Sequence, residues 1–292
     1  MSKLKEALDL LRQEAPLPGS KPAISHNGFD PHADGASVPA GRKRVTIEGP
    51  KYAVDRQQLI KGGLLAPQDH AAPVADEFRR IKRPLITNAA SSLGTGQGHM
   101  NVIMITSPMP AAGKTFCSVN LAVSISLERE LNALLVDADV AKRHISRELG
   151  LAEAPGLIDL LLDESRSLDE ALVRTDLNDI QVLPAGKGHP QATELLASDR
   201  MSRIIDELAT RYPDRIVIVD SPPLLITSEA QALANQVGQI ALVVEAGSTT
   251  QHSLLQTIEV LDGNKAINLI LNKCRHSSQF GYYGDYGYYG NQ

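Results

Sequence analysis

The stretch ITSPMPAAGKT, residues 105–115, decides the fold of this chain. It joins an apolar run, NVIM, to a segment with helical periodicity at about 114–131. It ends in Gly113-Lys114-Thr115, the last three positions of a phosphate-binding loop. In such a loop, backbone N–H groups face anionic oxygens, the lysine adds positive charge, and the threonine hydroxyl ligates Mg²⁺. Pro108 stands where the pattern has its first glycine, but the place between strand and helix favours a phosphate loop over an ordinary turn with a capping threonine.

Apolar β-type runs alternate with helical segments from residue 101 onward. The expected strands are NVIMIT (101–106), NALLVDAD (132–139), DIQVLPAG (179–186), RIVIVD (215–220), QIALVVE (239–245) and INLILN (267–272). The expected helices cover about 114–131, 157–174 and 194–211. This order predicts βαβ units in an α/β fold with a doubly wound, mostly parallel sheet. Several strands are apolar without alternation, as expected when helices cover both faces.

Two of these strands end in acidic residues. Asp137 and Asp139 close one strand, and Asp220 closes another. Ligands of open α/β sheets bind at the carboxyl ends of strands. Carboxylates at that edge can hold Mg²⁺ and its waters, and one can accept a proton from a hydroxyl. Capping of the following helices is the alternative role for each of them.

The first hundred residues lead into this sheet. Residues 2–14 place leucines on one helix face, and residues 15–50 are rich in Pro, Gly, Ser and His, as in a linker. A short helix within 51–66 is closed by two glycines, and a helix at 74–90 is expected to be interrupted or to end near Pro84. The predicted divisions are 1–50 (helix and flexible linker), 51–100 (helical lead-in), 101–276 (phosphate-loop domain) and 277–292 (tail).

Composition excludes several classes of protein. The chain of 292 residues has a net charge of −5, with 14 basic and 10 acidic side chains in residues 1–100 against 15 and 24 in residues 101–292. This acidic body argues against nucleic acid as the main partner. No apolar run approaches the roughly 18 residues of a membrane span. The two cysteines, Cys117 and Cys274, indicate a cytosolic chain with reduced, mostly buried thiols.

The tail carries an unusual cluster, GYYGDYGYYG, at residues 281–290. It holds five of the seven tyrosines: Tyr282, Tyr283, Tyr286, Tyr288 and Tyr289. No Leu, Ile or Val follows Leu271, so the tail cannot supply a core and is expected to be disordered. Glycine-separated tyrosines on such a tail suit a substrate that enters an active site.

The combination of ITSPMPAAGKT, LLVDAD, IVIVDSPP and the tyrosine cluster resembles the bacterial tyrosine kinases, and within them the cytoplasmic autokinases of exopolysaccharide synthesis. The resemblance covers roughly residues 50–292 and implies a MinD/ParA-like P-loop fold, with ATP and Mg²⁺ as cofactors. It implies that Lys114, Asp137, Asp139 and Asp220 are catalytic, with Asp137 as the base. It implies ATP binding by Pro110, Ala111, Ala112, Gly113, Lys114, Thr115, Phe116 and Asn272, and metal binding by Thr115, Asp139 and Asp220. The tail tyrosines would be the phosphoacceptors, reached between subunits.

The same resemblance implies partners. EFRRIKR fits the family pattern E-x-x-R-x-x-R through Glu77, Arg80 and Arg83, which in the family lies at the interface of ring-shaped oligomers. A solvated charged helix face is the alternative. Many relatives carry a fused membrane activator domain. This chain resembles those without one, so we expect a separate inner-membrane chain-length or activator protein and a peripheral place at the inner face of the membrane.

Two departures from the family concern the catalytic rate. The family loop reads PGEGKT, whereas Ala111 and Ala112 stand here, and Ala141 replaces an arginine.

Three other functions fit parts of the sequence. A ParA/MinD-type positioning ATPase shares the fold, but Met109 stands at its signature lysine and it needs no tyrosine tail. A binding protein with an adhesive Tyr/Gly tail would not need three carboxylates at strand ends. A tail that stacks on nucleic acid would pair its aromatics with Arg or Lys, and Asp285 is the only charged residue after His276.

Overall fold

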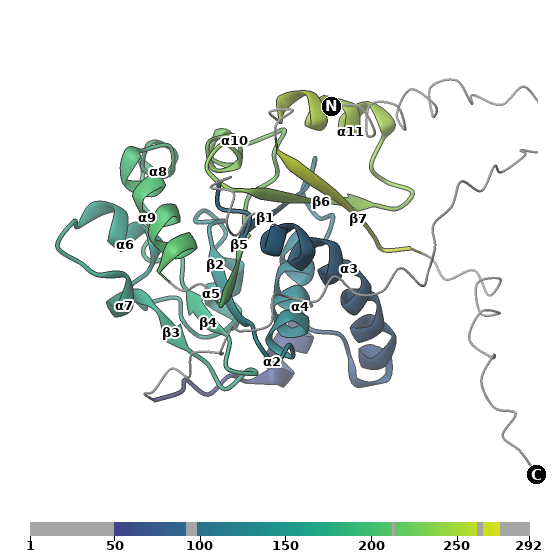
Figure 1. Ribbon diagram of the computed structural model, residues 1–292, viewed down its shortest axis with the longest axis horizontal. Coiled ribbons are helices and arrows are strands. Elements are labelled where there is room, and N and C mark those ends of the chain that lie inside the picture. The colour runs from purple at the N-terminus through teal and green to yellow at the C-terminus, as the bar shows by residue number, and fades with distance from the viewer. Residues whose placement is uncertain (1–49, 92–97, 212–213, 262–264, 275–292) are drawn as a thin grey trace, which may run out of the picture.

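The computed structural model describes residues 50–91, 98–211, 214–261 and 265–274 (Figure 1). The expected N-terminal helix, the linker and the tyrosine cluster lie outside these residues. The strands are β1 (Val102–Thr106), β2 (Asn132–Asp137), β3 (Val173–Arg174), β4 (Gln181–Leu183), β5 (Arg215–Asp220), β6 (Gln239–Glu245) and β7 (Ala266–Asn272). The α-helices are α2 (Arg56–Lys61), α3 (Ala71–Ser91), α4 (Lys114–Ser126), α5 (His144–Glu148), α6 (Leu157–Leu162), α7 (Leu168–Ala171), α8 (Ala192–Leu196), α9 (Asp199–Thr210), α10 (Ser228–Ala234) and α11 (Gln251–Val260), with a 3₁₀ turn at Gln68–His70.

The seven strands form one sheet in the order β3-β4-β2-β5-β1-β6-β7. All neighbouring strands are parallel except β3 and β4, which are antiparallel. The order reverses beside β1, so the loop after β1 lies where ligands of doubly wound sheets bind. This confirms the predicted fold class.

Two apolar cores cover the two faces of the sheet, because successive strand side chains point to opposite sides. Val102 and Met104 of β1 join one core with α6, α8, α9 and α10. Ile103 and Ile105 join the other with α2, α3, α4 and α5. Figure 1 shows α3 and α4 packed beside each other on that second face. No helix among the described residues is long and apolar enough to cross a bilayer.

The expectation that the helix at 74–90 breaks near Pro84 is wrong. Helix α3 runs through Pro84 to Ser91. The residues after the proline are held by tertiary contacts: Leu85 is buried, and its carbonyl oxygen accepts a 3.0 Å hydrogen bond from Gln239 Nε2. Burial of this face outweighs the missing N–H of the proline.

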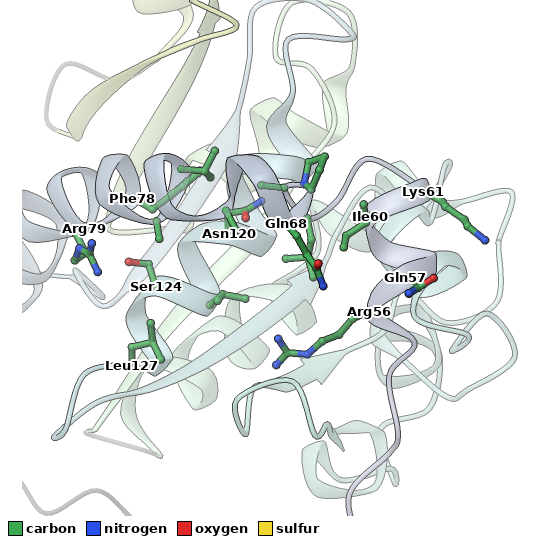
Figure 2. Close-up of a pocket in the computed structure, with 17 residues that line it drawn as sticks. Arg56, Gln57, Ile60, Lys61, Gln68, Phe78, Arg79, Asn120, Ser124 and Leu127 are labelled. Carbon is green, nitrogen blue, oxygen red and sulfur yellow. The ribbon is translucent and has the colours of Figure 1, made fainter. Parts of the chain in front are cut away.

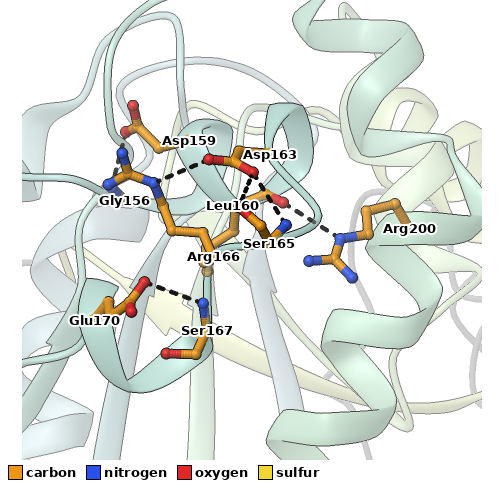
Figure 3. A network of polar contacts seen from close by, with 9 residues as sticks. All are labelled: Gly156, Asp159, Leu160, Asp163, Ser165, Arg166, Ser167, Glu170 and Arg200. Atoms are coloured by element: carbon orange, nitrogen blue, oxygen red, sulfur yellow. Dashed lines mark hydrogen bonds and ion pairs between the residues drawn. The ribbon is translucent and has the colours of Figure 1, made fainter.

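The expectation of one continuous helix at 157–174 is also wrong. The chain forms α6, then α7, then β3. Figure 3 shows why: Asp163 accepts hydrogen bonds from the backbone and hydroxyl of Ser165, and Ser167 caps α7 together with Glu170. Such side chains compete with helical backbone bonds and favour turns and caps.

Two smaller expectations are corrected. The helix expected at 194–211 is divided into α8 and α9, because Ser198 caps α9 through the N–H of Met201. Cys117 is buried, and burial raises the pKa of its thiol to about 12. Cys274 is exposed and lies two residues beyond the end of β7, so only one of the two thiols is buried.

Candidate active site

The phosphate loop runs between the carboxyl end of β1 and the first turn of α4. Gly113 is the N-cap of α4 and has a left-handed backbone, with φ of 92°. A Cβ at this position would lie 2.2 Å from Nδ2 of Asn272, so glycine is required both by conformation and by space. Ala111 is left-handed as well, with φ of 67°, a conformation that is unfavourable for a residue with a Cβ.

Lys114 is the first residue of α4, and its side chain is 94% buried, with 6% of its surface exposed. Burial lowers the pKa of Lys114, while the nearby carboxylates of Asp220 and Asp139 raise it and Lys142 lowers it. The ammonium group therefore lies within electrostatic reach of two of the three predicted carboxylates. Lys142, which directly follows Ala141, is a further cation near this site and is not among the predicted site residues.

The strand register brings the carboxylates together. β2 and β5 are neighbouring parallel strands, and Asp137 is the direct partner of Asp220. Neighbouring strands lie about 4.8 Å apart, so the two carboxyl groups lie side by side. Both are fully buried, and Asp139 is 5% exposed. The predicted grouping of Lys114 with the acidic strand ends is present in the fold.

Burial is the largest influence on the pKa of both Asp137 and Asp220. It raises the pKa of Asp220 to about 7, with a further increase from the charge of Asp137 and an opposing effect from the Ser118 hydrogen bond. It raises the pKa of Asp137 to about 6, against the hydrogen bonds that Ser146 donates. Two neighbouring carboxyl groups shielded from water are not readily ionised at the same time, because desolvation and mutual repulsion both disfavour the second negative charge. Asp137 is thus suited to take up a proton near neutral pH.

Two serines that the sequence reading missed hold these carboxylates. Ser146 donates to Oδ2 of Asp137 through its backbone N–H (2.8 Å) and its hydroxyl (2.6 Å). The same hydroxyl accepts from the N–H of Ala185 at 2.9 Å. Ser118 donates to Oδ1 of Asp220 at 2.8 Å. Ser118 follows Lys114 by one helical turn, a spacing that could have been noticed. Nothing in the sequence around Ser146 indicates its role.

The polar atoms of the site fit a magnesium-nucleotide ligand. Among the described residues, Oδ1 of Asp137 and Oδ2 of Asp220 are buried without a hydrogen-bond partner, and such atoms are costly unless a ligand or water satisfies them. The described carboxylates, histidines and cysteines form no group of three that could hold a metal alone. Mg²⁺ usually takes one or two carboxylates together with phosphate oxygens and waters. Thr115, Asp139 and Asp220 match that kind of donor set.

The end of β7 contacts the phosphate loop. Nδ2 of Asn272 donates to the carbonyl oxygen of Ala112 at 2.8 Å, and Nζ of Lys273 donates to that of Ala111 at 2.7 Å. Lys273 also pairs with Glu245 at 3.0 Å. A pocket of about 590 Å³ lies beside this contact, lined by 245–248 and Lys273. The expected adenine contact of Asn272 stays a prediction.

The remaining predicted ATP contacts differ in exposure. Ala112 is buried, while Pro110 and Ala111 are exposed. The ring of Phe116 packs edge-on against Phe78 of α3, with 6.0 Å between centroids. Its ring is thus engaged with α3, and its expected contact with ATP stays a prediction.

The predicted oligomer residues Glu77, Arg80 and Arg83 lie on the exposed surface of α3. Lys82, between them, is buried and donates to the carbonyl oxygen of Ser124 at 2.6 Å while pairing with Glu128. A separate groove of about 660 Å³ is lined by residues of α2, α3, α4 and the intervening loop. Figure 2 shows these lining residues.

Comparison with known proteins identifies the family to which the chain belongs. The family described as "AAA domain" matches residues 100–271. The tyrosine-protein kinase YwqD of Bacillus subtilis is 33% identical over 63% of this chain and 78% of its own length. EpsB of Ralstonia solanacearum is 29% identical over 81% of this chain, which spans only 29% of EpsB. The crystal structure of the chimerical protein CapA2B2 has a TM-score of 0.61 at 25% identity, covering 78% of this chain and 95% of that one. The chain belongs to the bacterial tyrosine kinase family, and this homology assigns it to the protein-tyrosine kinases.

Proposed function

We propose that this chain transfers the γ-phosphoryl group of ATP to tyrosines of its own tail, Tyr282, Tyr283, Tyr286, Tyr288 and Tyr289. The observation that carries the proposal is the buried Asp137–Asp220 pair beside the phosphate loop and Lys114. A family assignment alone does not name the acceptor. The tyrosine cluster supplies candidate acceptor hydroxyls, and the site supplies a cation and a proton acceptor for them.

Each residue of the site has a role in this reaction. Lys114 and the backbone N–H groups of the loop would bind the phosphates. Thr115, Asp139 and Asp220 would hold Mg²⁺, which supplies neutralisation of the phosphate charge when it is bound. The pocket beside Lys273 offers space for the nucleoside.

The transfer step itself follows from these positions. The tyrosine oxygen forms a bond to the γ-phosphorus, the bond between that phosphorus and the β–γ bridging oxygen breaks, and ADP leaves. The tyrosine proton passes to the carboxylate of Asp137. Ser146 keeps Oδ2 of Asp137 occupied, so Oδ1, which has no hydrogen-bond partner among the described residues, is the oxygen that would receive the proton. Positioning and charge stabilisation carry most of the rate in phosphoryl transfer.

The exposed face of α3 supports transfer between subunits. Glu77, Arg80 and Arg83 project from α3 without a structural role in the core, as residues of an assembly surface would. We propose that they join copies of the chain in a ring, so that the tail of one subunit reaches the site of the next.

The wider role follows from resemblance. Exopolysaccharide polymerisation or export is the process that autokinases of this family control. The similarity to the CapA2B2 chimera supports a second protein as activator, which we propose to lie in the inner membrane and to recruit this chain to its inner face.

One labelling experiment tests the proposal. Wild type, Lys114→Met and a chain truncated after Gln279 are incubated with γ-labelled ATP and Mg²⁺, and label on the protein is measured. We expect label on wild type alone. Label that persists on either variant contradicts the assignment. ATP hydrolysis by the wild type without label on the protein would instead identify a positioning ATPase.

A further inference from the structure

Ala111 occupies a conformation that its side chain disfavours. Its φ of 67° lies in the left-handed region. Glycine adopts this region without steric cost, whereas the Cβ of an alanine makes it unfavourable. The residue is exposed, so packing around its methyl group does not hold it there. The contact that the structure shows is at its carbonyl oxygen, which accepts a 2.7 Å hydrogen bond from Nζ of Lys273.

The next peptide is held in the same manner. The carbonyl oxygen of Ala112 accepts from Nδ2 of Asn272 at 2.8 Å. In a trans peptide the C=O and N–H groups point in opposite directions. Holding these two carbonyls toward the end of β7 therefore turns the N–H groups of Ala112 and Gly113 away from β7. Successive N–H groups aligned in this way make an anion-binding loop.

The donors are themselves fixed by the sheet. Glu245 of β6 is the ladder partner of Asn272 of β7, and its Oε1 lies 3.0 Å from Nζ of Lys273. The N–H of Ala246 donates to the carbonyl oxygen of Asn272 at 2.9 Å, which extends the ladder by one more bond. The ammonium is thus positioned by a carboxylate from the neighbouring strand.

We propose that Asn272, Lys273 and Glu245 form a strand-end clamp, which keeps the phosphate loop in its ligand-ready shape despite the alanine at position 111. The clamp rests on the proposed function, since it prepares the loop for the triphosphate of ATP. Lys273 and Asn272 are positioning residues in this role: they act on the backbone of the loop rather than on the reacting atoms.

The clamp predicts an energetic coupling between Lys273 and Ala111. Glycine at position 111 reaches the left-handed conformation without the help of Lys273. Removing the lysine should therefore harm ligand binding more when alanine is present than when glycine is. A lysine that only touches the ligand would cause the same loss in both backgrounds.

The test measures binding of inorganic triphosphate and of ATP, each with Mg²⁺, by calorimetry. Lys273→Met is made in wild type and in Ala111→Gly. We expect about tenfold weaker triphosphate binding in wild type, equivalent to about 1.4 kcal/mol, and about threefold or less in Ala111→Gly. Triphosphate lacks the nucleoside, so a loss seen with ATP alone would assign Lys273 to base recognition and overturn the clamp.

Two further variants control the measurement. Lys265→Met removes a lysine just before the other end of β7, whose Nζ also donates to backbone carbonyls, those of Asn235 and Val237, and it should leave triphosphate binding unchanged. Glu245→Gln keeps Lys273 but weakens its orientation, and we expect about threefold weaker binding. It keeps the clamp testable if Lys273→Met does not fold.

The outcomes separate the clamp from the proposed function. Equal losses from Lys273→Met in the two backgrounds, or no loss in wild type, overturn the clamp. If wild type and Lys114→Met bind triphosphate equally, the phosphate site itself is wrong and the proposed function fails with it.

Discussion

Asp137 and Asp220 are direct partners on the neighbouring parallel strands β2 and β5, and both carboxyl groups are fully buried. They are 83 positions apart in numbering, yet they share one desolvated place beside Lys114. Each has a raised pKa, about 6 for Asp137 and about 7 for Asp220. The site thus stores unfavourable electrostatic free energy that a magnesium-nucleotide ligand would relieve.

The first prediction concerns stability and pH. Because the folded pKa of each carboxyl group lies above the ordinary aspartate value of 3.8, the folded state binds more protons than the unfolded state between these values. The contribution of the pair to stability is therefore fully present below about pH 3.8 and is lost as pH rises through about 6 to 7. We expect Asp220→Asn to raise the free energy of unfolding at pH 8 by about 2–4 kcal/mol.

Urea unfolding without metal or nucleotide, at pH 5 and pH 8, measures this effect. Glu259→Gln, at an exposed carboxylate of α11, serves as the matched control and should change neither value by more than about 0.5 kcal/mol. A lower stability of Asp220→Asn at pH 8 would contradict the buried-pair account.

The second prediction concerns Ser146. Ser146→Ala removes the hydroxyl donor from Asp137 and leaves the N–H of Ala185 without its acceptor. We expect a loss of about 2–4 kcal/mol in the free energy of unfolding, because both groups are buried. Ser165 makes the same two donations to Asp163 at the surface. Ser165→Ala should cost less than about 1 kcal/mol, and equal costs would show that burial is not what matters.

The third prediction concerns Ala111. Ala111→Gly relieves the left-handed strain but increases the freedom of the unfolded chain. We expect a net gain of about 0.5–1 kcal/mol in the free energy of unfolding. Ala112 is buried, and its φ is not positive. Ala112→Gly should therefore lower the free energy of unfolding by a similar amount. Chemical denaturation measures the free energy of unfolding of both variants. A lower free energy of unfolding in Ala111→Gly would show that the alanine is not strained.

The fourth prediction separates assembly from folding on α3. Arg80→Ala with Arg83→Ala removes exposed guanidinium groups and should convert oligomers to monomers while the free energy of unfolding changes by less than about 1 kcal/mol. Lys82→Met removes a buried ammonium from its contacts with Ser124 and Glu128 and should destabilise by about 1–3 kcal/mol. Light scattering measures the size of the oligomer, and thermal unfolding measures the change in stability. An unchanged oligomer in the double variant would remove α3 as the assembly surface.

Two wrong helix predictions can each be traced to the contacts of particular residues. Pro84 predicts a break in isolation, but the buried Leu85 and the hydrogen bond from Gln239 keep α3 continuous. The apolar pattern around residues 157–174 suggests one helix, but the Asp163–Ser165 turn and the pairing of Val173 with β4 divide it. At Pro84 a contact with a distant residue outweighs the local pattern, whereas at Asp163 a local side-chain turn interrupts the helix.

The sequence by itself determined the fold class and predicted where the site lies. Alternating apolar runs and helical segments specify a doubly wound sheet, and GKT after the first strand with acidic residues at the ends of two others predicts phosphate chemistry at one edge. Only the tertiary structure decided that Asp137 pairs with Asp220, that Ser146 and Ser118 hold them, and that Lys273 reaches Ala111. The reason is physical. Periodicity follows from local chain geometry, whereas strand order and burial, which set these contacts and the pKa values, depend on residues that meet only in the folded chain.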